Sequence, residues 1–101
     1  AKFVEYEPKF YTYQRRAQIY LEHDMYEEAI ADYTEAIRLA EFKTGVLVER
    51  GETYIEMKKY AEAAKDFEEA LKIKETVSHE ILNKRLTWIK QKMAEEGSLQ
   101  K

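Results

Sequence analysis

Residues 26–41 read YEEAIADYTEAIRLAE, and residues 60–75 read YAEAAKDFEEALKIKE, 34 positions later. Extended without a gap, the same offset pairs residues 10–43 with residues 44–77, and ten of the 34 pairs are identical. The identical pairs are Arg16/Arg50, Tyr20/Tyr54, Glu22/Glu56, Tyr26/Tyr60, Glu28/Glu62, Ala29/Ala63, Asp32/Asp66, Glu35/Glu69, Ala36/Ala70 and Glu41/Glu75. Gapless agreement over a whole period indicates an internal repeat, in which each unit packs on its neighbour.

Each period contains two stretches with apolar residues at helical spacing, as Leu47, Gly51 and Tyr54 illustrate. We therefore expect helices near residues 9–23, 26–40, 45–57 and 60–74. The short turns between them force neighbouring helices to run antiparallel. Glycine within a helix costs about 1 kcal/mol relative to alanine. Gly51 is therefore expected at a close helix approach, where a larger side chain would push the helices apart.

A fifth helix is expected over residues 79–95, with Ser78 as its N-cap. Ile81 and Trp88 stand one period after Leu47 and Tyr54, so they should face the preceding hairpin. A lone helix in this place would cover the last repeat, as terminal caps do in finite arrays. We assign one domain over residues 1–101, with repeats at 10–43 and 44–77, a capping helix at 78–95, and extensions at 1–8 and 96–101.

Composition narrows the functional class. The 101-residue chain is 45% hydrophobic and 37% charged, has a formal net charge of −3, and contains no cysteine. This balance argues against nucleic acid as a partner, and the lack of cysteine excludes disulfides, thiolate nucleophiles and the usual structural zinc sites. No apolar run is long enough to insert into a membrane. The missing start methionine suggests a mature form or a piece of a longer protein, and we favour the cytoplasm.

The repeat resembles the tetratricopeptide repeat (TPR) family, whose period is 34 residues. The second copy matches the family pattern at Leu47, Gly51, Tyr54, Tyr60, Ala63, Phe67 and Ala70. The first copy matches at Tyr13, Ala17, Tyr20, Tyr26, Ala29, Tyr33 and Ala36. Arg16 and Arg50 depart from it, since the pattern has leucine there, and Glu41 and Glu75 replace its proline.

The resemblance implies an all-α fold, a right-handed superhelix of stacked antiparallel helical hairpins. It also implies a concave groove, lined by the first helix of each pair, that takes up a peptide or helix from another protein. By helical phase, the first helices should contribute Tyr11, Gln14, Arg15, Gln18, Leu21 and Glu22, then Val48, Glu49, Glu52, Ile55 and Glu56. The capping helix should contribute His79, Leu82, Asn83 and Leu86. The alternative is that these faces are merely solvated.

Three glutamates in the expected groove, Glu49, Glu52 and Glu56, share one helix face, because they are spaced i, i+3 and i+7. On the neighbouring helix, Arg15 supplies only one positive charge. A segment that carries lysine or arginine with an apolar anchor should therefore bind there. Val48, Ile55 and Leu82 are the expected apolar contacts.

Some members of the family hold the C-terminal carboxylate of heat-shock chaperones with lysine, arginine and asparagine side chains. The matching positions here are Gln14, Gln18, Glu49, His79 and Asn83. None of them is a cation, and Glu49 would repel an anionic ligand at close range. We therefore expect a neutral or basic ligand rather than a chaperone tail.

No catalytic, cofactor-binding or metal-binding residues are predicted. His23 lies near a turn and His79 begins a helix, so neither has an obvious nucleophile partner, and no Glu-x-x-His motif occurs. Two functional classes remain. The chain is either an adaptor that recognises a partner's peptide, or a structural or regulatory module of a larger protein that docks intramolecularly or self-associates.

Overall fold

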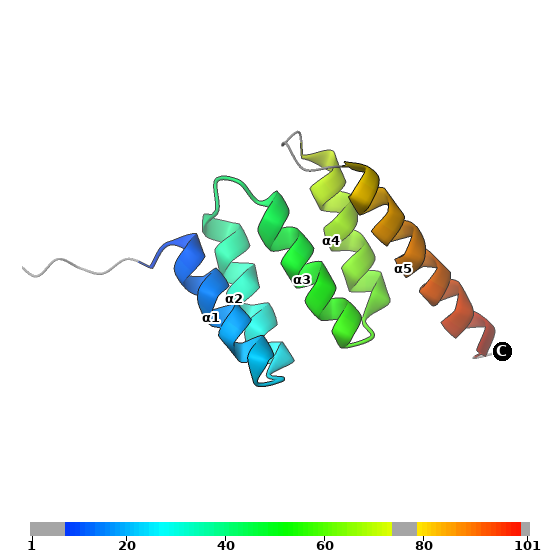
Figure 1. Ribbon diagram of the computed structural model, residues 1–101, viewed down its shortest axis with the longest axis horizontal. Coiled ribbons are helices and arrows are strands. Elements are labelled where there is room, and N and C mark those ends of the chain that lie inside the picture. The colour runs from blue at the N-terminus through cyan, green and yellow to red at the C-terminus, as the bar shows by residue number, and fades with distance from the viewer. Residues whose placement is uncertain (1–7, 74–78, 100–101) are drawn as a thin grey trace, which may run out of the picture.

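The computed structural model describes residues 8–73 and 79–99, and this part of the chain forms five helices and no strands. The helices are α1 (Phe10–Glu22), α2 (Tyr26–Leu39), α3 (Thr44–Glu56), α4 (Tyr60–Lys72) and α5 (His79–Leu99). They lie side by side in chain order (Figure 1). The predicted all-α class is confirmed, and the first four helices begin and end within two residues of expectation. The expected N-cap, Ser78, lies outside the described residues.

The last helix is longer than the sequence suggested. We expected it to end near residue 95, because the chain becomes polar after Met93 and passes through Gly97, but α5 continues to Leu99. A single glycine costs only about 1 kcal/mol in a helix, so Gly97 does not have to end one. An added Cβ at Gly97 would have no heavy atom within 4 Å, which shows that this glycine serves no close approach.

The two hairpins turn in the same way. Asp24 follows α1 with a φ of 57°, and Lys58 follows α3 with a φ of 60°, so both residues are in the left-handed region. The amide of the next residue then donates to the carbonyl of Tyr20 at 2.9 Å in the first hairpin and of Tyr54 at 2.8 Å in the second. These bonds satisfy carbonyl groups that a helix end leaves unpaired. The repeat therefore extends to the backbone of the turns.

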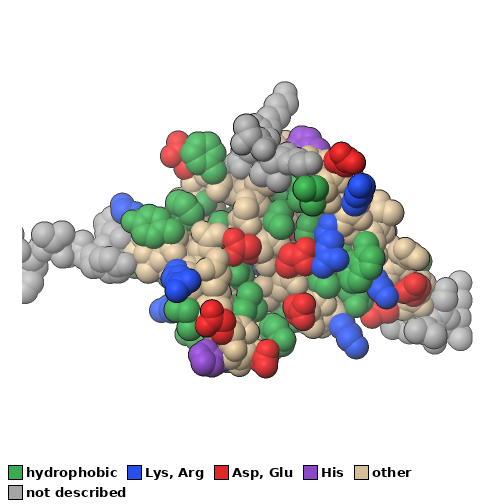
Figure 2. All heavy atoms as spheres, viewed as in Figure 1, with side chains coloured by type: hydrophobic (Ala, Val, Ile, Leu, Met, Phe, Trp, Pro, Cys, Tyr) green, Lys and Arg blue, Asp and Glu red, His purple; other side chains and the backbone are tan. Residues whose placement is uncertain are grey.

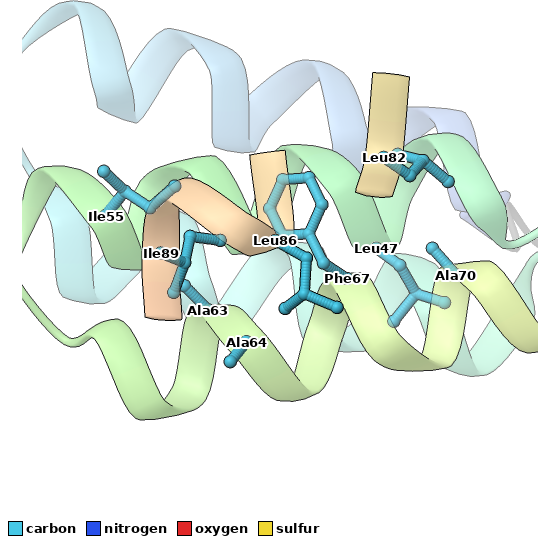
Figure 3. Packing of buried hydrophobic residues seen from close by; sticks show 9 residues of the cluster. All are labelled: Leu47, Ile55, Ala63, Ala64, Phe67, Ala70, Leu82, Leu86 and Ile89. Atoms are coloured by element: carbon cyan, nitrogen blue, oxygen red, sulfur yellow. The ribbon is translucent and has the colours of Figure 1, made fainter. Parts of the chain in front are cut away.

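The core consists of two clusters, one for each hairpin. The first contains Ala17, Ala29, Tyr33, Ala36 and Val46. The second contains Leu47, Ile55, Ala63, Ala64, Phe67, Ala70, Leu82, Leu86 and Ile89, with side chains from α3, α4 and α5 converging around Phe67 (Figure 3). Val46 comes from α3 but is buried with the first hairpin, and Ile37 packs against both clusters. The two repeats thus share one continuous stack.

The expected role of Gly51 is confirmed by its surroundings. A Cβ added at Gly51 would lie 2.7 Å from Cε2 of Phe67 and 3.3 Å from Cβ of Asp66. Such a distance to a buried ring is too short for any side chain, so α3 and α4 can pack this closely only because residue 51 has none.

The phase predicted for α5 was wrong by one residue. Ile81, expected on the packing side, is 67% exposed, whereas Leu82 is 2% exposed and Leu86 and Ile89 are also buried. One position corresponds to about 100° of rotation around a helix. Arg85 stands one period after Gly51, and an approach as close as that of Gly51 to Phe67 leaves no room for an arginine side chain. The helix instead packs through its 82, 86 and 89 face.

Both arginines that depart from the family pattern are paired within their own repeat. Arg16 binds Asp32 through two hydrogen bonds of 2.7 and 2.8 Å, and Arg50 binds Asp66 through two of 2.8 and 2.6 Å. Both aspartates are buried. Such two-point pairing fixes the planar guanidinium against the carboxylate and links the two helices of each hairpin. This pairing explains why both residue types recur at the 34-residue offset.

Candidate partner-binding groove

The groove begins with a hollow of about 390 Å³ between α1, α2 and α3, which we call the first hollow. Its lining residues are Gln18, Leu21, Tyr33, Val48, Glu49, Glu52, Thr53 and Glu56. Six of these were expected from helical phase, so the structure brings the predicted residues of α1 and α3 to one place. Tyr33 and Thr53 were missed, because phase assigned Tyr33 to the interior and Thr53 to no site. The lining carries three carboxylates and neither lysine nor arginine.

Glu49 is held by three side-chain hydrogen bonds in the first hollow. Its carboxylate accepts hydrogen bonds from Nε2 of Gln14, from Nε2 of Gln18 at 2.8 Å, and from the Tyr33 hydroxyl at 3.2 Å. All three donors are neutral, and none of the ion pairs between described residues involves Glu49. The network therefore fixes the position of a negative charge without cancelling it.

The Tyr33 hydroxyl is held in its neutral form. Burial in the core, followed by the nearby Glu49 charge and the hydrogen bond to it, raises the pKa of Tyr33 well above its ordinary value. Tyr33 belongs to α2 and Glu49 to α3, so this hydrogen bond also joins the first hairpin to the second. The interior aromatic of the first repeat thus reaches the floor of the groove.

Glu52 is neutralised by a residue that the sequence analysis did not single out. Arg85 of α5 binds both oxygens of Glu52, at 2.8 and 2.6 Å, and its guanidinium lies 4.6 Å from the centre of the Trp88 ring. Arg15, the positive charge expected from the neighbouring helix, lines neither hollow, and the cation that binds Glu52 comes from α5 instead. Arg85 was missed because its position depends on the rotation of α5, which the repeat phase misplaced by one residue.

A second hollow of about 350 Å³ continues the groove between α3, α4 and α5. Its lining residues are Val48, Glu52, Phe67, Ile81, Leu82, Lys84, Arg85 and Trp88. Val48 and Glu52 line both hollows, so the two adjoin along α3. Figure 2 shows acidic side chains over α3 and basic side chains over the neighbouring part of α5. The charge of the groove therefore changes sign along its length.

The other expected groove residues are more scattered. Tyr11, Arg15, Glu22 and His79 are exposed but line neither hollow, and Asn83 lines a shallow depression on α5 with Glu80, Lys84 and Thr87. Ile55, Leu82 and Leu86 are at most 8% exposed and belong to the core. Because a buried side chain cannot offer its surface to a partner, Ile55 and Leu82 are corrected from ligand contacts to core residues.

The fold and the groove define a class, the helical-hairpin repeat proteins. A tetratricopeptide repeat model matches residues 10–42 and 45–76, and the chain belongs to the tetratricopeptide repeat family. The repeats of this family are non-enzymatic and mediate protein–protein interactions. Membership therefore indicates that the chain is a protein–protein interaction module. No curated protein matches the chain. Within the described ranges, no helix is long and apolar enough to cross a membrane, and no three His, Asp or Glu side chains gather as metal ligands.

Proposed function

We propose that the groove binds a segment of another protein, and that this segment is neutral or basic. The observation that carries the proposal is the lining of the first hollow, where three carboxylates meet without a lysine or arginine among them. Arg85 pairs with Glu52, but none of the ion pairs between described residues involves Glu49, and Glu56 is exposed. A positive side chain placed there gains attraction to two carboxylates and repels none of the lining residues.

The hydrogen bonds of Glu49 argue against a chaperone carboxylate as the ligand. In the family members that hold a chaperone carboxylate, the positions of Gln14, Gln18 and Glu49 contact that ligand. Here Gln14 and Gln18 both donate to the carboxylate of Glu49. The amide groups that could donate to an incoming carboxylate already donate to an internal one. An anionic tail would have to displace Glu49 and approach its charge.

The test is the binding of a synthetic peptide that carries two lysines and one leucine, measured by calorimetry. Replacement of Glu49, Glu52 and Glu56 by glutamine should weaken binding, with each pair worth about 0–1 kcal/mol because the pairs are partly solvated. The affinity of the parent should also fall as salt is raised, since exposed charges are screened. The single variant Glu56→Gln leaves the hydrogen bonds of Glu49 and the ion pair of Glu52 in place, so its effect isolates charge from packing.

A matched control removes the same number of carboxylates elsewhere. Glu27, Glu28 and Glu68 are exposed and line none of the hollows described above. Their triple replacement by glutamine should leave peptide affinity unchanged, and circular dichroism should show that both triple variants keep their helices. Equal binding of the peptide to the parent and to the groove triple variant would refute the acidic-groove proposal.

A further inference from the structure

The second hollow differs from the first in its walls. Five of its eight lining residues are apolar or aromatic, namely Val48, Phe67, Ile81, Leu82 and Trp88. Phe67 and Leu82 are buried core residues beneath the hollow, so its accessible apolar surface comes from Val48, Ile81 and Trp88. Ile81 is the most exposed of them at 67%, and Trp88 is half-buried. An exposed isoleucine and a half-buried tryptophan in the lining of one hollow leave apolar surface in contact with water, which a ligand side chain could cover.

The Trp88 wall is held in place on several sides. The Arg85 guanidinium lies 4.6 Å and the Lys92 ammonium 5.5 Å from the ring centre, and the Tyr60 ring packs edge-on at 6.2 Å. Because Arg85 is also fixed by its two bonds to Glu52, the ring and the cation form one preorganised surface. A ligand that binds here does not have to order this surface first.

Lys84 is the cation of this hollow that is most open to a ligand. Its ammonium group lies 3.4 Å from Glu80, and both side chains are more than three quarters exposed. A pair of this kind is weak, since water and salt screen it. The lining of the second hollow therefore carries two cations against the single carboxylate of Glu52.

We propose that the second hollow is a subsite with its own specificity, which takes an apolar side chain of the partner segment beside an acidic residue that pairs with Lys84. The inference rests on the proposed function, since Val48 and Glu52 join this hollow to the first and one segment can cross both. The basic residues of such a ligand lie on α3, and its apolar and acidic residues lie on α5. Its charge order then fixes its direction across the groove.

The experiment uses the full chain and four synthetic peptides without tryptophan. The first carries two lysines, the second adds a leucine, the third adds a glutamate next to that leucine, and the fourth is the third with glutamine in place of lysine. Leucine should tighten binding about tenfold, as for partial burial of one apolar side chain, and glutamate should add about twofold to fivefold. Trp88 is the single tryptophan, so its emission should shift to the blue with the leucine peptides alone.

Two exposed substitutions test the contacts without touching the core. Ile81→Ser should abolish the gain from leucine, and Lys84→Gln the gain from glutamate. Ile19→Ser and Lys90→Gln are the matched controls, since both residues are exposed and neither lines the second hollow. The controls should keep the affinities of the parent.

The outcomes separate this inference from the proposal on which it rests. In one outcome, the lysine peptide binds and the triple glutamine variant binds it more weakly, but the added leucine does not raise the affinity and Ile81→Ser behaves like Ile19→Ser. That outcome refutes the second subsite and leaves the proposed function standing. If the fourth peptide binds as tightly as the third, with Trp88 responding, the second hollow is a binding site and the acidic groove is not. If no peptide binds, both are refuted.

Discussion

The two hairpins have the same helices, the same turns and the same arginine–aspartate pair, but they differ in what covers them. The side chain of Arg50 is 20% exposed and donates to Thr34 of the preceding hairpin at 3.1 Å, whereas the side chain of Arg16 is 58% exposed. Asp32 and Asp66 are buried alike. The same residue pair therefore has a different environment in each repeat, because stacking covers the second pair and leaves the first beside water.

The two hairpins also use different residues where their paired helices approach each other. The first combines Ala17 with Tyr33, and the second combines Gly51 with Phe67. The Tyr33 hydroxyl hydrogen-bonds to Glu49 of the next repeat, while Phe67 has no such group and its ring lies against Gly51. The aromatic residue at this position therefore connects the first repeat to the second in the case of Tyr33. In the case of Phe67, it packs within its own repeat.

The largest expected difference between the hairpins concerns the ion pairs. Asp66→Ala leaves the half-buried Arg50 without its carboxylate, and we expect a loss of about 2–4 kcal/mol in the free energy of unfolding. Asp32→Ala should cost less, since Arg16 can bind water instead. Urea unfolding followed by circular dichroism measures both. Equal losses would show that coverage by the neighbouring repeat does not set the strength of the pair.

A smaller effect is expected at the close approach in the second hairpin. Gly51→Leu should destabilise the protein by about 1–3 kcal/mol through overpacking against Phe67, despite the better helix propensity of leucine. Gly45 is the matched control, because it is exposed and a Cβ there meets no heavy atom within 4 Å. Gly45→Leu should be neutral or slightly stabilising. A Gly51→Leu variant as stable as the parent would contradict the packing assigned to this site.

The smallest expected effect at neutral pH is that of Tyr33→Phe, which makes the first hairpin resemble the second. Loss of one of the three hydrogen bonds to Glu49 should cost about 0.5–1.5 kcal/mol. The pKa of Tyr33 is raised in the folded state, so its contribution to stability is complete below the ordinary tyrosine pKa of about 10 and falls at higher pH. Above that pH the parent should lose stability faster than Tyr33→Phe. Parallel stability curves for the two proteins would rule out this pKa shift.

The repeat and most helix bounds could be predicted because they depend on local information. Ala17, Gly51 and the apolar spacing around them place helices and close contacts without knowledge of the rest of the chain. The same spacing correctly brought Gln18, Glu49 and Glu56 to one hollow, since the rotation of α1 and α3 follows from the positions that they bury. Arg85 could not be found in this way, because α5 packs through a different face from the one that the repeat implied.

The sequence by itself determined a pair of 34-residue helical hairpins, followed by a fifth helix, with an acidic face on α3. Only the tertiary structure decided which of those charges are satisfied: Glu49 by neutral donors, and Glu52 by Arg85. The physical reason is that helical periodicity is a local property, whereas an ion pair between α3 and α5 requires the rotation of one helix against another. In α5, the structure shows that the packed face is that of Leu82, Leu86 and Ile89.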